Sequence, residues 1–156
     1  MNKNFFEVKN VDFSVSGKTK VINASFSIKN EGDVVCLLGP SGIGKTTVLR
    51  SIAGLEKIKN GTIELNNKIL SSKNINVDPE NRNISLAFQE NSLFPHYTIE
   101  KNILLGAERN KNNKGKKINL KELIDLLDIS HILNKFPHQV SAGEAQRASL
   151  ARSLVS

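Results

Sequence analysis

The sequence is poor in cysteine and in long apolar runs. Its one cysteine, Cys36, excludes an internal disulfide framework and a multi-cysteine zinc site, and it fits a reducing compartment. The longest apolar run, residues 34–38, is far shorter than the roughly 20 residues that a transmembrane helix needs. No apolar stretch of signal-peptide length follows Met1. We therefore expect neither secretion nor membrane spanning.

The chain of 156 residues also has less negative than positive charge, with 22 Lys and Arg against 15 Asp and Glu and a net charge of +7. Such a balance permits nucleic acid, anionic lipid or phosphate ligands, although many basic proteins bind none of them. Five positive charges gather in residues 109–117 without a negative one. That run has no aromatic residue on which a base could stack, which favours a solvated loop over a binding patch. No nucleic-acid partner is expected.

The first third of the chain has the pattern of β-strands. Apolar and polar residues alternate loosely over residues 5–13 and 21–28, which predicts two strands with a turn at 17–18. The predicted inward positions of the second strand are Ile22, Ala24, Phe26 and Ile28. The continuous apolar run 34–38 predicts a strand that is buried on both faces of a parallel sheet.

From Lys45 onward apolar residues recur every three or four positions, which predicts a helix that ends at Gly54. A hairpin is predicted over residues 62–70, with its turn at Asn66 and Asn67, and a short strand over 84–88. The chain then becomes helical, with apolar faces made by Ile99, Ile103, Leu104, Leu120, Leu123, Ile124, Leu127, Ala148, Ala151, Leu154 and Val155.

Between the predicted strand 34–38 and the predicted helix, the chain satisfies the pattern G-x-x-x-x-G-K-[ST], with Gly39, Pro40, Ser41, Gly42, Ile43, Gly44, Lys45 and Thr46 in order. Glycines let the backbone turn with positive φ and bring its N–H groups close to phosphate oxygens. Lys45 is placed to span the β- and γ-phosphates, Thr46 to ligate magnesium and Thr47 to bond an α-phosphate oxygen. The alternative is a glycine-rich turn with an incidental lysine. A chance match occurs in on the order of one chain in a hundred, before this context is required.

Three further features accompany this phosphate loop. Gln89 ends the predicted short strand, Leu-Phe-Pro-His occupies 93–96, and residues 140–147 open the last predicted helix. With them the chain resembles, almost from end to end, the nucleotide-binding subunit of an ATP-binding cassette (ABC) transporter. The resemblance implies an α/β fold, a P-loop NTPase of ABC type with a mixed sheet, an N-terminal antiparallel β-subdomain and a helical subdomain. Residues 53–56 and 93–98 are most similar to importers of inorganic ions, polyamines and sugars, among which iron(III) is favoured.

The resemblance also implies roles for single residues. The loop from Gly39 to Thr47 holds the phosphates of ATP, with Lys45 catalytic. Gln89 matches the glutamine that coordinates Mg²⁺ and senses the membrane subunit. Gln89 is therefore expected to be a second catalytic residue and, with Thr46, a metal ligand. Phe13 lies where the family stacks an aromatic ring on adenine, but it fits the core face of its strand equally well.

Residues 140–144 resemble the ABC signature, usually Leu-Ser-Gly-Gly-Gln, and depart from it at three positions, Val140, Ala142 and Glu144. Ser141 can cap the helix and contact phosphate, and Gly143 lets the helix approach a γ-phosphate closely. A carboxylate at Glu144 is unfavourable near a polyphosphate unless it points away.

In that family the signature acts on the nucleotide of a second subunit. The resemblance therefore implies ATP and Mg²⁺, a head-to-tail pair of ATPase subunits, membrane permease subunits and, indirectly, a substrate-binding protein, at the cytoplasmic face of the membrane. Phe94, Pro95, His96 and the helix from Thr98 would line the groove that meets the permease.

The family's Walker B strand, catalytic glutamate and switch histidine would lie beyond Ser156, so the resemblance predicts an N-terminal fragment that is inactive alone. We divide it into a β-rich core with the phosphate loop, residues 1–91, a helical subdomain, 92–142, and the signature helix, 143–156. The strands 34–38 and 84–88 are then expected to lack partners and to expose apolar faces.

None of the three histidines, at positions 96, 131 and 138, matches the switch histidine, and His131 is expected to be an ordinary surface or helix-edge residue. The predicted function of the complete protein is ATP hydrolysis coupled to solute import. The alternatives are a nucleotide-binding module without hydrolysis and a soluble ABC-type ATPase that acts on ribosomes or DNA.

Overall fold

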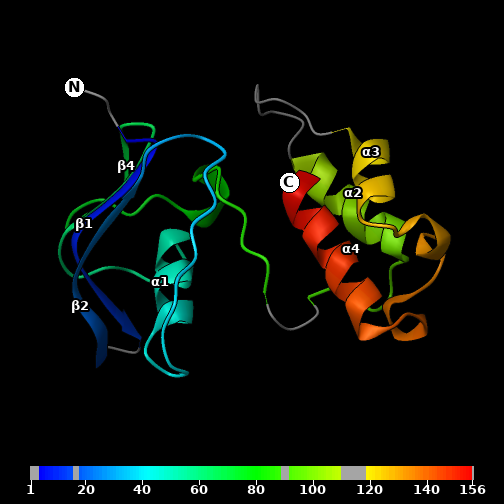
Figure 1. The fold of residues 1–156 in the computed structure, drawn as a ribbon, viewed down its shortest axis with the longest axis horizontal. Coiled ribbons are helices and arrows are strands. Elements are labelled where there is room, and N and C mark those ends of the chain that lie inside the picture. Colours follow the sequence, from blue (N-terminus) through cyan, green and yellow to red (C-terminus); the bar gives the residue numbers. More distant parts are fainter. Residues whose placement is uncertain (1–3, 16–17, 89–91, 110–118, 156) are drawn as a thin grey trace. The chain divides into compact units, whose positions relative to one another are not determined.

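The computed structural model describes residues 4–15, 18–88, 92–109 and 119–155. The chain folds as two compact units, residues 1–84 and residues 85–156 (Figure 1). The first unit contains the β-sheet and the phosphate loop, and the second contains helices.

An antiparallel sheet of order β2-β1-β3-β4 forms the first unit. Its strands are β1, Phe6–Val15, β2, Lys18–Ile28, β3, Thr62–Leu65, and β4, Lys68–Ser71. The two N-terminal strands and the hairpin predicted from the sequence are thus confirmed. At the hairpin turn Asn66 and Asn67 have φ of 50° and 63°. Two successive left-handed residues make the turn whose twist suits a two-residue hairpin, and asparagine tolerates that conformation.

The pairing of β1 with β2 is irregular on both sides of Val11. Val11 pairs with Ala24 and Phe13 with Val21, so β2 carries one more residue than β1 over this stretch. Such a bulge shifts the alternation of side chains from one face to the other. As a result Ile22 is 76% exposed, and Val21 packs against the core in its place. The predicted inward position of Ile22 is wrong.

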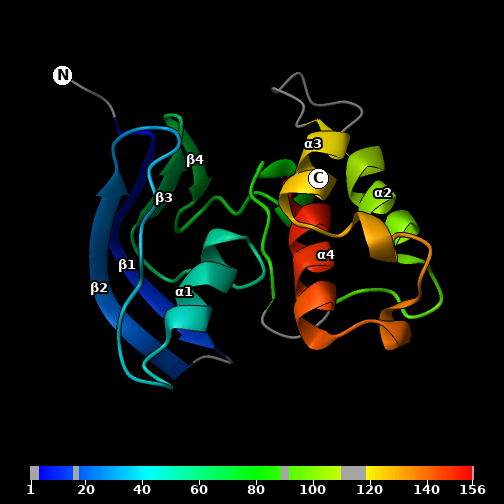
Figure 2. The same ribbon diagram turned by 45° about the vertical axis from the view of Figure 1, so that its right-hand side comes forward.

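Helix α1, Lys45–Ile52, lies against the sheet (Figure 2). Val48 and Ile52 join the core, whose buried members are Phe6, Val8, Val11, Phe13, Val48, Ile58, Ile63 and Leu70. The helix ends as predicted, because Gly54, with φ of 87°, donates its N–H to the carbonyl of Ser51. Glycine adopts this left-handed conformation without the steric cost that a Cβ would bring.

The end of α1 is also held by Arg82, which is 1% exposed. Its five N–H groups are all donated: Nη1 to the carbonyls of Ser51 and Ile52 at 3.1 and 2.9 Å, Nε to the carbonyl of Val77 at 2.8 Å, and Nη2 to Ser71 Oγ and Asn76 Oδ1 at 2.8 and 3.0 Å. A buried guanidinium therefore ties the C-terminus of α1 to the segment after β4.

Two apolar segments that the sequence predicted to be strands form no strand within the described residues. Residues 34–38 and 84–88 have no strand pairing there. Val34 is 92% exposed, Leu38 88% and Phe88 42%. The strand predictions are thus wrong for this structure, because a strand is defined by hydrogen bonds to a neighbour. The expectation that both segments lack partners and expose apolar side chains is confirmed.

The second unit is a helical bundle. It contains α2, Ile99–Arg109, α3, Leu120–Leu126, and α4, Ala142–Val155, with the 3-10 turns η3, Ser130–Ile132, and η4, Pro137–Gln139. Its buried apolar side chains are Leu93, Ile99, Ile103, Leu123, Ile129, Ile132, Ala145, Ala148, Ala151 and Val155. No helix of the described residues is long and apolar enough to cross a membrane.

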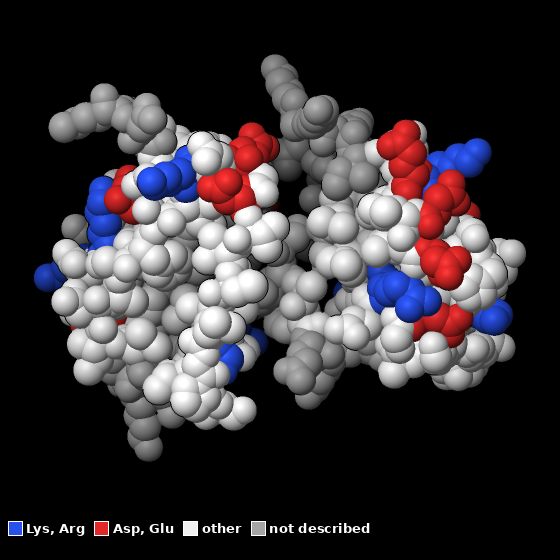
Figure 3. Space-filling view, viewed as in Figure 1, with Lys and Arg blue, Asp and Glu red and all other residues white. Residues whose placement is uncertain are grey.

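Two predicted inward positions of this unit are wrong: Leu104 is 40% exposed and Leu154 44%. Helices α2 and α4 approach closely at Gly106, where a Cβ would collide with the carbonyl oxygen of Arg152. On the face drawn in Figure 3, basic side chains are interspersed with acidic ones. The basic run 109–117 lies, from residue 110 on, outside the described residues.

Candidate functional site

The phosphate loop is exposed and leads directly into α1. Residues 39–43 are all exposed, and Gly42 and Gly44 have φ of 80° and 113°. Glycine is the residue that adopts these angles without strain. Gly44 is the N-cap of α1, and no side chain caps the helix there. The free N–H groups and the positive end of the helix dipole make this turn suited to an anion.

Lys45 folds back over the start of the same loop. Its Nζ donates to the carbonyls of Gly39 and Pro40 at 2.7 and 2.8 Å. The ammonium group therefore lies over the turn, held by two neutral acceptors. Thr46 is an exposed residue next to Lys45, whereas Thr47 is only 7% exposed.

Two other predicted site residues stand apart from this arrangement. Phe13 is fully buried in the core of the first unit, at 0% exposure, which fits the alternative that it is a core residue. A base could stack on its ring only if the ring left the core. Gln89 lies outside the described residues.

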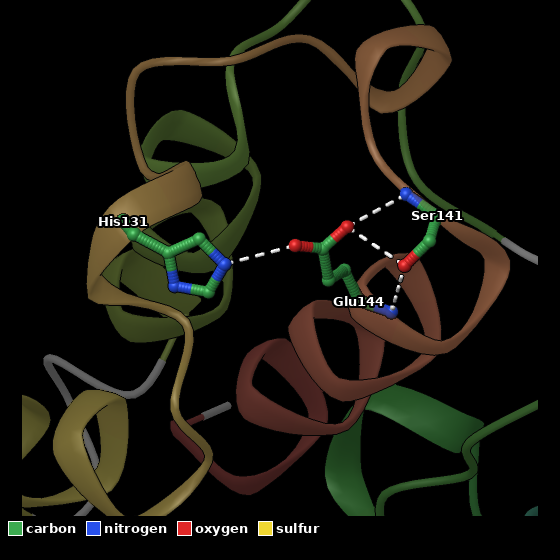
Figure 4. A network of polar contacts seen from close by, with 3 residues as sticks. All are labelled: His131, Ser141 and Glu144. Atoms are coloured by element: carbon green, nitrogen blue, oxygen red, sulfur yellow. Dashed lines mark hydrogen bonds and ion pairs between the residues drawn. The ribbon is translucent and has the colours of Figure 1, made fainter.

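The start of α4 is closed by a reciprocal cap (Figure 4). Glu144 Oε2 accepts hydrogen bonds from the backbone N–H and the hydroxyl of Ser141, both at 2.7 Å, and the N–H of Glu144 donates to Ser141 Oγ at 3.3 Å. This Ser-x-x-Glu arrangement is a capping box. The carboxylate thus folds back onto Ser141, and Gly143 in the same turn has open space for a close approach, with Arg147 Nη1 3.8 Å from the position of a Cβ.

The other oxygen of the Glu144 carboxylate is 2.9 Å from Nε2 of His131, in η3. The hydrogen bonds from the hydroxyl and N–H of Ser141, followed by that from His131, lower the pKa of Glu144 to about 2. The sequence predicted that Ser141 caps the helix and that Glu144 is tolerated only if it points away, but it gave no sign of His131. No spacing signal could have found it, because η3 and the residues after it separate His131 from Glu144 in the chain.

The segment that begins at Leu93 is fixed from beneath by Asn102, which is 0% exposed. Asn102 Nδ2 donates to the carbonyls of Phe94, Tyr97 and Thr98 at 3.0 to 3.2 Å, and its Oδ1 accepts the N–H of Phe94 at 2.7 Å. Phe94, 45% exposed, is presented next to the rings of His96 and Tyr97. The predicted permease-facing segment is therefore a rigidly held, exposed aromatic cluster.

These features define a P-loop nucleotide-binding fold with a separate helical unit that carries a serine-capped helix. The chain belongs to the ABC transporter family, since the family model described as "ABC transporter" matches residues 21–156. The fold class predicted from the sequence, a P-loop NTPase of ABC type, is confirmed.

Curated relatives agree. The chain is 36% identical over 155 residues to the Fe(3+) ions import ATP-binding protein FbpC 2 of Haemophilus influenzae, covering 99% of this chain and 43% of that protein. It is 40% identical over 134 residues to an FbpC protein of Fusobacterium nucleatum, covering 85% and 35%. It is also 36% identical over 147 residues to the sn-glycerol-3-phosphate import ATP-binding protein UgpC of Brucella abortus, covering 94% and 41%. The chain thus spans less than half the length of these relatives.

Solved structures share the fold. An ATP-binding subunit of an ABC transporter superposes with a TM-score of 0.77 at 22% identity, over 96% of this chain and 61% of that one. A dimeric ATP-binding cassette in a post-hydrolysis state, bound to ADP and Pi, superposes with a TM-score of 0.76 at 26% identity, over 96% and 69%.

Proposed function

We propose that the complete protein is the ATP-binding and ATP-hydrolysing subunit of an ABC importer and couples hydrolysis to solute import. The observation that carries this proposal is the exposed loop 39–43, which runs through Gly44 into the start of α1, a helix that no side chain caps, with Lys45 folded over the loop. The relatives are named import ATP-binding proteins, which supports the direction of transport.

The loop binds ATP through charge and backbone geometry. The N–H groups of Gly42, Ile43 and Gly44 and the start of α1 receive the phosphate oxygens, with Gly39, Pro40 and Ser41 forming the rest of the cradle. Lys45 exchanges its two carbonyl acceptors for β- and γ-phosphate oxygens, a charge-assisted and therefore stronger pair of bonds. Its ammonium group then stabilises the charge that develops during phosphoryl transfer, which makes Lys45 a catalytic residue.

The residues around the loop also fit a magnesium ion. Thr46, an exposed residue beside Lys45, offers a hydroxyl oxygen, and oxygen is the ligand that Mg²⁺ prefers. Gln89 supplies the second protein oxygen in this proposal. When bound, the ion neutralises negative charge on the phosphate oxygens. Beside this ion site, the hydroxyl of Thr47 donates a hydrogen bond to an oxygen of the α-phosphate.

The second half of the site comes from another copy of the chain. Ser141 and Gly143 at the start of α4 contact the γ-phosphate of ATP held by the partner, in a head-to-tail dimer, and the dimeric relative bound to ADP and Pi supports such an assembly.

The exposed aromatic cluster around Phe94 contacts the permease subunits, and the protein lies at the cytoplasmic face of the membrane. The solute reaches the permease through a substrate-binding protein. Iron(III) is the favoured solute, in line with the FbpC relatives.

Turnover in the protein expressed from its complete reading frame tests this function. Wild type should hydrolyse ATP in the presence of Mg²⁺ and co-purify with a multi-span membrane protein, and Lys45→Ala should abolish hydrolysis. ATP binding without any turnover would instead favour the nucleotide-binding module. Co-purification with ribosomes or DNA would favour the soluble ATPase.

A further inference from the structure

The Glu144 carboxylate receives donors from two separate elements. Ser141, which precedes α4, donates to Oε2 through its N–H and its hydroxyl. His131, in η3, approaches Oε1 with Nε2 at 2.9 Å (Figure 4). Because an ionised carboxylate can only accept hydrogen bonds, Nε2 of His131 is the donor. The side chain of Glu144 is 20% exposed and that of His131 52%, so the contact stands at the edge of the surface.

A carboxylate at this place opposes the proposed function of the helix end. The N–H groups and dipole of α4 favour a phosphate beside Ser141 and Gly143. The negative charge of Glu144, in the first turn of the same helix, repels that phosphate, and the repulsion grows when a second subunit excludes water from the site. The capping box turns the carboxylate toward Ser141, but its second oxygen still needs a partner.

We propose that His131 is a positioning residue for the phosphate-contacting end of α4. Its donation to Glu144 Oε1 keeps the carboxylate turned back in the capping box and offsets its charge, so that Ser141 and Gly143 receive the γ-phosphate of ATP bound by a second copy. The inference rests on the proposed function, because it assumes that α4 acts on the partner's nucleotide. It explains how a signature with glutamate in its last position is compatible with a polyphosphate.

Two other basic residues near the start of α4 face neighbours other than Glu144. Arg147 lies one turn further along α4, with Nη1 3.8 Å from the position of a Cβ on Gly143, so it faces Gly143. His138, in η4, stacks on the ring of Phe136, with centroids 5.8 Å apart and planes at 15°. His138 is therefore a matched control: the same residue type in the same connection, engaged with a different neighbour.

A double-mutant cycle in the protein from the complete reading frame tests the proposal, with wild type, His131→Ala, Glu144→Gln and the double variant. His131→Ala should raise the KM for ATP in turnover about two- to fivefold, the range expected for loss of a partly exposed hydrogen bond to a carboxylate. It should leave the Kd for ATP of the isolated subunit unchanged, since the phosphate loop is intact. In the Glu144→Gln background, with no charge left to offset, removal of His131 should change KM less than about 1.5-fold. His138→Ala should match wild type.

Two results overturn the inference: a KM for His131→Ala equal to that of wild type, or the same fold increase in both backgrounds, which is the result of a merely structural contact. The melting temperature (Tm) of every variant is measured beside the kinetics. A merely structural contact of His131 lowers Tm by the same amount whether residue 144 is glutamate or glutamine. A wild-type protein that binds no ATP overturns the proposed function together with this inference. A wild-type protein that hydrolyses ATP while His131→Ala behaves identically overturns the inference alone.

Discussion

Replacing Arg82 by methionine removes all five hydrogen bonds that a buried guanidinium makes in the first unit. Methionine matches the length of the arginine stem but takes one donor away from each of five acceptors, among them the carbonyl of Ile52 at the end of α1. The carbonyl of Ser51 keeps the N–H of Gly54 as a donor. Each buried acceptor that loses its partner costs about 1–3 kcal/mol. Because apolar burial of methionine and entry of water offset part of this, we expect a total loss of about 3–5 kcal/mol.

The assay is thermal unfolding of the complete protein, monitored by circular dichroism, with Arg50→Met as the matched control. At about 2–4 °C per kcal/mol for a domain of this size, Arg82→Met should lower Tm by about 10 °C. Arg50 is 38% exposed and meets Glu56 at 3.4 Å, so its loss should cost under about 1 kcal/mol. An Arg82→Met protein that melts within 2–3 °C of the control would refute the assignment of Arg82 as the tie between α1 and the segment after β4.

Three further changes probe other contacts, each measured by urea unfolding. Gly54→Ala should cost about 1–3 kcal/mol, because φ is 87° and the new Cβ would collide with Arg82; a neutral result would contradict the packing there. Asn102→Ala should cost about 2–4 kcal/mol and loosen the segment around Phe94, seen as faster hydrogen exchange; unchanged exchange would argue against it. Glu144, with its pKa lowered from 4.5 to about 2, contributes stability above pH 4.5 that is lost as the pH falls toward 2. The stability difference between wild type and Glu144→Gln should therefore shrink as the pH falls from 4.5 toward 2; a difference that stays constant from pH 5 down to pH 3 would be inconsistent with the cap.

Sequence patterns within a few residues predicted those parts of the fold that depend only on neighbouring residues. The asparagine pair at 66–67 predicted the hairpin turn because both residues tolerate positive φ, and the three-to-four spacing after Lys45 predicted α1 because one face of a helix must be apolar. Ser141 predicted a cap on α4 for a similar reason, because a serine side chain can accept a hydrogen bond from the first turn of the helix. Each of these depends on residues within one turn of each other.

Features that depend on contacts between residues far apart in the sequence could not be predicted from such patterns. The bulge that exposes Ile22 is a property of how β1 pairs with β2. The run 34–38 has the composition of a buried strand, but composition does not supply the neighbour that a strand needs. His131 and Arg82 are joined to their partners by side-chain contacts that no periodicity encodes. The candidate site was predicted because the phosphate loop is a local motif, whereas the support around it was not.

Calorimetric titration of ATP into the protein expressed from its complete reading frame, with Mg²⁺ present, tests the central claim most directly. The account predicts saturable binding that Lys45→Ala severely weakens, because the ammonium group that lies over the turn is the cation that meets the phosphates. No heat of binding at millimolar ATP, or equal affinity in wild type and Lys45→Ala, would contradict it.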